Sequence, residues 1–251
     1  MTSDHTHFSH LHWTPVHDVA EFRLTPVHRV WLVTGCISVA ISLAKSITGS
    51  ISSGLWLQSS FAAFMGYLVA DLTSGVYHWA IDNYGGPETL VYGSYINTFQ
   101  GHHRWPSSIT YYEAVSGTYK IARGVAFLLL PLHFLINNPV LHSFLGVYGG
   151  FTTFSAQFHE WAHRPKSRVP PLVIVLQEMG LLLSPRKHAK HHRPPHEGSY
   201  CTISGLSNEF LDNFRVFRGM EMILFSLFGA RPRSWIKDSE TSSLAISPNH
   251  A

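Results

Sequence analysis

The 251-residue chain contains few charged residues and only two cysteines. Asp, Glu, Lys and Arg make up 13% of the sequence, about half of the roughly 25% that is usual in soluble domains. Cys36 and Cys201 cannot form a disulfide framework, and neither has a CxxC partner. The net charge is only +3, and no Lys/Arg-rich stripe alternates with aromatic residues. These absences argue against nucleic-acid binding and against a disulfide-stabilised secreted domain.

The first 28 residues have no charged segment followed by an apolar core, so they do not resemble a secretory signal. Asp4, Asp18 and Glu21 are also unusual in an organelle transit peptide, which is normally poor in acidic residues. We therefore expect a flexible tail at 1–28, a membrane domain at 29–236 and a second flexible tail at 237–251.

Most apolar residues lie in four stretches, at 30–44, 55–70, 124–136 and 140–158. A membrane-crossing helix needs about 20 mainly apolar residues, and the glycines and alanines within these stretches suit close helix packing in lipid. The sequence therefore predicts an all-α membrane protein with about four transmembrane helices. The alternative is a soluble protein in which these segments are buried core helices.

Lysine and arginine are distributed unevenly over this predicted topology. With four crossings, 17 of the 18 Lys and Arg residues fall on the side of the N-terminus, and Lys45 is the exception. This is the asymmetry of a positive-inside membrane protein. Two further apolar segments, at 171–183 and 209–228, are short or mixed with charge, so we expect interfacial helices there.

Histidine is abundant, with 18 residues, as many as Lys and Arg together. Nine candidate ligands fall in four short motifs that the topology places on the positive side: His78 and Asp82, His102 and His103, His159 and His163, and His188, His191 and His192. The spacings of three and four residues put side chains on one helical face. Eight or nine ligands are too many for one ion, so the pattern predicts two metal ions.

The remaining histidines have simpler interpretations. His133 and His142 flank the turn on the opposite side, where we expect no metal site, and His196 is an undecided ligand or supporting residue. The others are assigned to the tails or the surface: His5, His7, His10, His12, His17, His28 and His250.

The motif HEWAH also matches HExxH, in which two histidines bind zinc and the glutamate acts as a general base. An intramembrane zinc protease with Glu160 as its base is therefore an alternative. It needs only three protein ligands and would leave most of the clustered histidines unexplained. A non-catalytic metal transporter or scaffold is a further alternative.

Removing hydrogen from an alkyl chain requires a strong oxidant, which iron can generate from O₂, and imidazole is a suitable iron ligand. The chain has no GxGxxG loop, haem CxxCH motif or iron–sulfur cysteine set. Electrons would therefore come from an external donor. An acidic redox protein, or alternatively lipid phosphates, could bind at five cationic residues: Arg164, Lys166, Arg168, Arg186 and Lys187.

Several segments, in order, resemble the Kua-type lipid desaturase domain over about residues 30–235: VADLTSGVYHWAIDNYG, FQGHHRWP, QFHEWAH, LLLSPRKHAKHHRPP and YCTISGLSN. That family includes the animal plasmanylethanolamine desaturase and a plant plastid enzyme that introduces a trans-3 double bond into palmitate of phosphatidylglycerol. HWAIDNYG, QGHHRWP and GARPRSW are closer to the plastid branch, whereas His196 in PPHE resembles the ether-lipid branch.

The resemblance implies an O₂-dependent desaturase with two iron ions that acts on a membrane glycerolipid. The eight clustered histidines would be the ligands, with Asp82 and Asn208 as additional or supporting positions. Ferredoxin would be the donor, with cytochrome b5 as the alternative, and the location would be a plastid membrane or alternatively the endoplasmic reticulum. Vinyl-ether formation and lipid hydroxylation remain alternative reactions.

Overall fold

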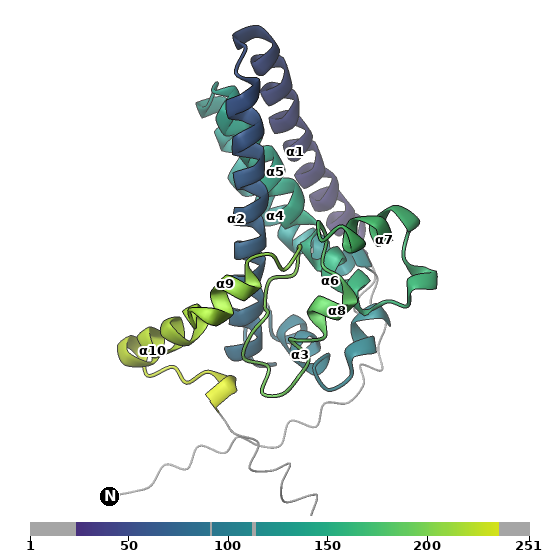
Figure 1. Ribbon diagram of the computed structural model, residues 1–251, viewed down its shortest axis with the longest axis vertical. Coiled ribbons are helices and arrows are strands. Elements are labelled where there is room, and N and C mark those ends of the chain that lie inside the picture. The colour runs from purple at the N-terminus through teal and green to yellow at the C-terminus, as the bar shows by residue number, and fades with distance from the viewer. Residues whose placement is uncertain (1–23, 91, 112–113, 236–251) are drawn as a thin grey trace, which may run out of the picture.

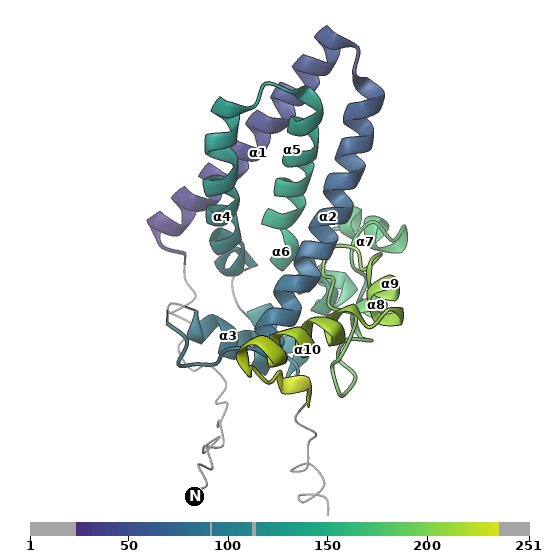
Figure 2. The same cartoon turned by 90° about the vertical axis from the view of Figure 1, so that its left-hand side faces the viewer.

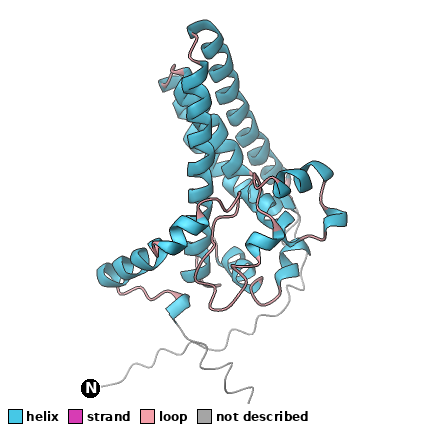
Figure 3. Cartoon of the chain, viewed as in Figure 1, coloured by secondary structure: helices cyan, strands magenta, loops and turns pink. Residues whose placement is uncertain are grey.

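The computed structural model describes residues 24–90, 92–111 and 114–235 (Figure 1). Within these ranges every regular element is helical, as predicted, and loops join the helices (Figure 3). The ten α-helices of this part of the chain are α1 (Pro26–Ser53), α2 (Trp56–Asn83), α3 (Gly93–Gly101), α4 (Ala114–Leu135), α5 (Pro139–Thr153), α6 (Ser155–His163), α7 (Pro171–Glu178), α8 (Pro185–His188), α9 (Asn208–Asn213) and α10 (Val216–Phe228).

Four helices, α1, α2, α4 and α5, form an elongated bundle (Figure 2). Helix α5 packs against α1 and α2, and α1 also packs against α4. Glycine permits one of the close contacts, because a Cβ atom on Gly66 would lie 2.6 Å from the carbonyl oxygen of Phe144. The remaining short helices gather around one end of this bundle (Figures 1 and 2).

Local sequence signals explain where two of these helices begin. The hydroxyl of Thr25 accepts a hydrogen bond from the backbone N–H of His28, and Pro26 fills the first helical position. Helix α1 therefore begins at Pro26, three residues before the expected boundary at 29. Asn138 caps α5 in the same way, by accepting from the N–H groups of Val140 and Leu141.

Helix α1 has its polar residues inside and its apolar residues outside. Four serines spaced by four residues, Ser38, Ser42, Ser46 and Ser50, are buried. Val33, Ile37 and Ile51 lie on the outer surface and are more than half exposed. A soluble helix would show the reverse arrangement, whereas small polar residues between helices are common in membranes.

The four predicted spans correspond to helices, of which α1, α2 and α4 are longer than the apolar stretches at 30–44, 55–70 and 124–136. The stretch predicted at 140–158 is divided, because α5 ends at Thr153 and α6 begins at Ser155. By length and apolar composition, α1 is the single helix in the described ranges that qualifies as a candidate membrane span. The all-α membrane-desaturase architecture is thus supported, and the number of spans stays a prediction.

The segment predicted as one interfacial helix at 209–228 is two helices. Arg215 adopts a left-handed backbone conformation, with φ of 50°, and separates α9 from α10. Helix α10 exposes apolar side chains such as Met222, Ile223 and Leu227, while Phe217 and Glu221 are buried. Its amphipathic character agrees with the sequence-based expectation.

Candidate metal centre

All eight clustered histidines meet at the end of the bundle around which the short helices gather. His78 and Asp82 come from the last turns of α2, and His102 and His103 follow α3. His159 and His163 lie on α6, whereas the fourth motif, with His188, His191 and His192, spans α8 and the turn after it. The described part of the chain contains two separate groups of potential ligand atoms within this cluster.

The first group, the five-histidine group, consists of His102, His159, His163, His188 and His192. The Nε2 atom of His188 lies 2.8 Å from that of His159, 2.9 Å from that of His163 and 3.0 Å from that of His192. Two imidazole nitrogens, each about 2.1 Å from one ion and at right angles, would be about 3.0 Å apart. The observed spacings therefore match ligands that share an ion.

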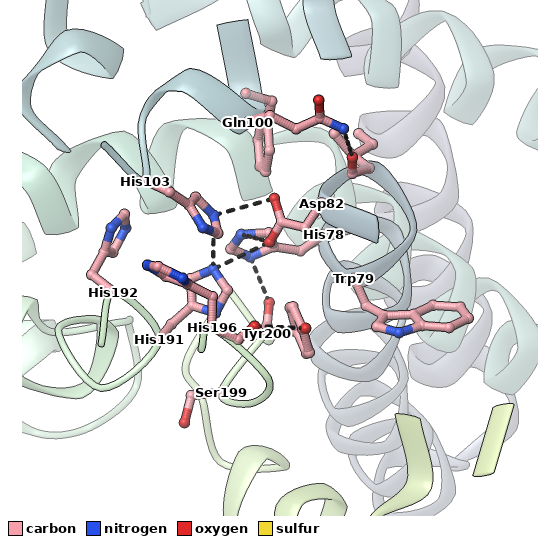
Figure 4. Close-up of polar contacts among 12 residues, drawn as sticks. His78, Trp79, Asp82, Gln100, His103, His191, His192, His196, Ser199 and Tyr200 are labelled. Carbon is pink, nitrogen blue, oxygen red and sulfur yellow. Dashed lines mark hydrogen bonds and ion pairs between the residues drawn. The ribbon is translucent and has the colours of Figure 1, made fainter. Parts of the chain in front are cut away.

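The second group, the Asp82 group, consists of His78, Asp82, His103 and His191 (Figure 4). Asp82 Oδ2 lies 3.2 Å from Nε2 of both His78 and His191, and Asp82 Oδ1 lies 3.2 Å from Nε2 of His103. The Nε2 atoms of His103 and His191 are also 3.2 Å apart. One carboxylate and three imidazoles thus converge with the spacing expected for a second ion.

Backbone carbonyl groups set the orientation of the rings. Nδ1 of His78 lies 2.9 Å from the carbonyl oxygen of Tyr200, and Nδ1 of His191 lies 2.8 Å from that of Gly198. Nδ1 of His102 contacts the carbonyl oxygen of Phe99. A carbonyl only accepts, so each Nδ1 carries the proton and each Nε2 presents a lone pair to the centre. Such outer contacts fix the tautomer and orientation of metal-bound histidines.

The environment of His163, His191 and His192 favours the neutral imidazole that a metal ligand must be. Burial, followed by repulsion from neighbouring histidines, lowers the pKa of His163 to about 3 and that of His192 to about 2. Burial also lowers the pKa of His191 to about 4, although Asp82 partly opposes that shift. Converging lone pairs repel one another unless a cation lies between them, so the donor set fits two metal ions.

Contacts between α2 and the loop after Gly198 explain how distant segments meet. The carboxylate of Asp71 is fully buried and accepts hydrogen bonds from the backbone N–H groups of Ser204, Gly205 and Ser207. At Gly75, an added Cβ would lie 2.6 Å from Sγ of Cys201. These contacts fasten the loop to α2 and place the Tyr200 carbonyl beside His78.

Asn208 supports the same loop from the other side. Its Oδ1 accepts from the N–H of Cys201 at 2.8 Å, and its Nδ2 lies 3.4 Å from the carbonyl oxygen of Cys201. The structure therefore gives Asn208 a supporting position, outside both ligand groups. Asp71 was not singled out from the sequence, and the signal available was an acidic residue within an apolar helix.

His196 and Glu160 also lie outside both ligand groups. The ring of His196 is 4.6 Å from that of His103, which places it at the edge of the Asp82 group. Glu160 is bound to Arg164 and, at 2.5 Å, to Nε2 of Gln157. Its carboxylate is thus held away from the histidines, which does not favour the protease alternative.

A cavity of about 530 Å³ opens beside the Asp82 group. Asp82 and His103 form its inner wall, and Arg233 donates a hydrogen bond to the carbonyl oxygen of Gly85 at 2.6 Å. The lining combines polar and charged side chains with apolar surface: Asp82, Asn83, Gln100, His103, Pro194, Pro195, His196, Glu197, Arg233 and Ser234.

Comparison with known proteins gives consistent matches. Fatty acid desaturase 4, chloroplastic, from Arabidopsis thaliana is 48% identical over 211 residues, which cover 84% of this chain and 65% of that protein. Fatty acid desaturase 4-like 1, chloroplastic, from the same plant is also 48% identical, covering 84% of this chain and 72% of the relative. Plasmanylethanolamine desaturase from Myxococcus xanthus is 32% identical, covering 80% of this chain and 72% of that protein.

The chain thus spans just under two thirds of the length of the first of these relatives. No solved structure matches it significantly. The lipid desaturase domain model matches residues 67–235, a range that includes every member of both ligand groups. The resemblance seen in the sequence is confirmed, and the chain belongs to the lipid desaturase domain family of enzymes.

Proposed function

We propose that the protein is a membrane acyl-lipid desaturase that uses two iron ions and O₂. The proposed substrate is palmitate esterified to phosphatidylglycerol, and the proposed product is its trans-3 hexadecenoyl form. The observation that carries this proposal is the convergence of two adjacent ligand groups, built from eight histidines and Asp82, in a member of the lipid desaturase family.

The proposed membrane arrangement has α1, α2, α4 and α5 crossing the bilayer, with the histidine-rich end at its positively charged surface. The reversed pattern of α1, with serines inside and isoleucine and valine outside, supports contact with lipid. The exposed apolar residues of α10 suit the interface beside the site. The similarity to chloroplastic relatives leads us to propose a plastid membrane as the location.

In the proposed reaction, two hydrogen atoms leave adjacent carbons of the acyl chain. Together with two electrons and two protons from outside, they reduce one O₂ molecule to two water molecules. Bound iron would supply the oxidising power for breaking the C–H bonds. The chain has no internal electron source of its own, so we propose a ferredoxin as donor, bound through exposed cations such as Lys166, Arg168 and Arg186.

In this proposal, the side chains of the protein bind the two metal ions and enclose them. Hydrogen bonds to backbone carbonyls keep Nε2 of His78 and His191 directed inward. Burial of both residues limits the access of water, which protects a reactive site from side reactions. Polar and charged side chains in the lining of the cavity beside Asp82, among them Gln100, Arg233 and Ser234, could bind the ester and head group of a lipid. A polar end held there would bring carbons near the ester close to the ions.

The test is to express the chain in a host without related desaturases, together with a matched ferredoxin, and to analyse its lipids by mass spectrometry. We expect cells that produce the wild type to contain phosphatidylglycerol with a trans-3 hexadecenoyl group. Cells that produce the His102→Ala variant should lack this group. Unchanged acyl chains in a folded, iron-loaded protein would contradict the proposal.

A second candidate function is the formation of a vinyl ether from an ether phospholipid. Two observations favour it: the similarity to plasmanylethanolamine desaturase and the position of His196 beside His103. Supplying plasmanyl lipids to the same cells distinguishes the two reactions, because mild acid cleaves vinyl ethers and leaves acyl esters intact. If the cells contain an acid-labile product while the acyl chains of phosphatidylglycerol are unchanged, the protein has the second function.

A further inference from the structure

A second set of ionisable residues, two buried histidines and a half-buried lysine, lies at the far end of the bundle, away from both ligand groups. Lys45 on α1, His133 on α4 and His142 on α5 surround the turn between α4 and α5. His142 is 1% exposed and His133 is 8% exposed. Ionisable residues at membrane depth are costly and are usually retained for a function, so this cluster requires an explanation.

The histidines of this far-end cluster are not arranged to share a metal ion. Their ring centroids are 5.9 Å apart and the rings are stacked at 27°. Nε2 of His142 donates to the carbonyl oxygen of Ile136 at 2.9 Å, which leaves Nδ1 buried without a hydrogen-bond partner. Both ring nitrogens of His133 also lack a hydrogen bond of ordinary geometry, although the backbone of Ser38 approaches the ring.

Lys45 supplies a positive charge that forms no salt bridge with a carboxylate of the described residues 24–90, 92–111 and 114–235. The sequence contains no Asp or Glu at 24–70 or 114–159, which covers α1, α5, the first half of α2 and all of α4. The ammonium group instead donates to the carbonyl oxygen of His133 at 2.5 Å. That contact uses one of its three donors, and a neutral carbonyl does not cancel a full charge.

A cavity of about 280 Å³ adjoins this charge. Its walls carry an ammonium, an imidazole, a carboxamide and two hydroxyl groups, and they include no acidic residue; the lining is Lys45, Thr48, Gly49, Ser52, Asn137 and His142. The exposed carboxamide of Asn137 and the remaining donors of Lys45 suit an oxyanion.

The position of the cavity indicates where the anion comes from. Pro139, at the start of α5, packs against Gly49, one helical turn beyond Lys45. Figure 2 shows the turn between α4 and α5 at the end of the bundle opposite α3 and α10. The neighbouring surfaces at Phe134, Leu135 and Leu141 are apolar and exposed, as acyl chains would require. The source is therefore a lipid rather than a soluble anion.

We propose that this far-end cavity binds the phosphate group of an anionic glycerophospholipid in the leaflet opposite the metal centre. This lipid is a second, non-reacting ligand, distinct from the substrate proposed above. The site takes part in no chemistry, and its lipid contributes to the stability of the α1, α4 and α5 packing. Failure of this proposal would therefore leave the desaturase proposal untouched.

The test uses the full chain, purified in detergent, and counts retained lipids by native mass spectrometry during titration with phosphatidylglycerol or phosphatidylcholine. We expect Lys45→Gln to weaken retention of one phosphatidylglycerol at least about 10-fold, whereas Lys45→Arg keeps it. Asn137→Ala, which does not alter the Asn138 cap, should weaken retention about threefold. The control is Arg231→Gln. It removes an exposed cation near the metal end, by which we mean the end of the bundle that carries the two ligand groups, and it should leave retention unchanged.

Equal retention of phosphatidylglycerol by the wild type and Lys45→Gln would overturn the proposal. Lys45 would then serve only to bind the carbonyl oxygen of His133 near the end of α4. Competition by millimolar inorganic phosphate would also overturn it, since the site would then take a soluble anion. If Lys45→Gln does not fold, the Asn137→Ala titration decides, and unchanged retention there counts against the site.

Discussion

The two ends of the helical bundle both bury histidines, yet their geometry differs. At the metal end, the Nε2 atoms of His159, His163 and His188 lie within 3.3 Å of one another. At the far end, the rings of His133 and His142 stack at 5.9 Å beside an unbalanced lysine. The first arrangement suits a shared cation and the second an anion. Burial of imidazole alone therefore does not identify a metal site.

The contacts behind the rings account for part of this difference. At the metal end, carbonyl oxygens of Phe99, Gly198 and Tyr200 hold Nδ1 and leave Nε2 free to bind an ion. At the far end, His142 is held through Nε2, and its free Nδ1 faces no second imidazole nitrogen within hydrogen-bond distance. Outer contacts that point rings toward a common centre are what convert several histidines into a ligand set.

The largest effect should follow from removing a ligand at the metal end. His191→Ala should lower desaturation to background and reduce the iron content, because the Asp82 group keeps only three of its four ligands. The comparison variant is His142→Ala, which removes a similarly buried imidazole at the far end. Metal analysis of both purified proteins should show iron loss in the first and none in the second. Equal iron loss in both would remove the distinction between the two ends.

A large loss of stability should follow from Asp71→Asn, which replaces a carboxylate that accepts three backbone hydrogen bonds. Hydrogen bonds to a charged acceptor each contribute about 1.5–3 kcal/mol, so we expect the free energy of unfolding to fall by about 3 kcal/mol. Thermal unfolding in detergent measures the change.

The same variant should also disturb the metal end more than the far end, because the loop that Asp71 holds carries the carbonyl behind His78. Iron content should fall, while retention of phosphatidylglycerol stays at the wild-type value. A stable protein with full iron occupancy would show that this anchor is dispensable.

A smaller effect is expected from Asn208→Ala, which removes the side-chain hydrogen bond to the Cys201 N–H. The loop should move enough to loosen His78 without removing any ligand. Loss of such supporting contacts typically lowers metal affinity 10- to 100-fold, and we expect a decrease of about 10-fold in iron affinity. Chelator competition measures the affinity, and Asn208→Asp, which retains the acceptor, should recover most of it.

The smallest effect should come from Glu160→Gln. The Glu160 carboxylate is bound to Arg164 and Gln157 rather than directed to the ligand groups. We therefore expect desaturation to stay within about threefold of the wild type. Complete loss of activity in a folded, iron-loaded Glu160→Gln protein would instead support a general-base role in the HExxH motif.

The sequence was sufficient to predict the helical class and the residues that meet at the metal end. Helical spacing places His159 with His163, and His188 with His192, on common faces. The charge asymmetry placed all four motifs on one side of the predicted topology. These features follow from local periodicity and hydropathy, which can be derived from a single chain.

Other features depend on contacts between distant segments and were not predictable in this way. The division of the ligands into two groups requires Asp82 to reach both His103 and His191. The anchoring by Asp71 depends on a loop more than 130 residues later in the chain. The break at Arg215 depends on a backbone conformation that the amphipathic pattern of 209–228 does not reveal.

The central claim, that two ligand groups hold two iron ions, is tested most directly by counting the metals in the purified 251-residue chain. Elemental analysis of protein produced with ample iron should give two irons per folded molecule. Zinc alone, a single iron or a metal-free folded protein would contradict it.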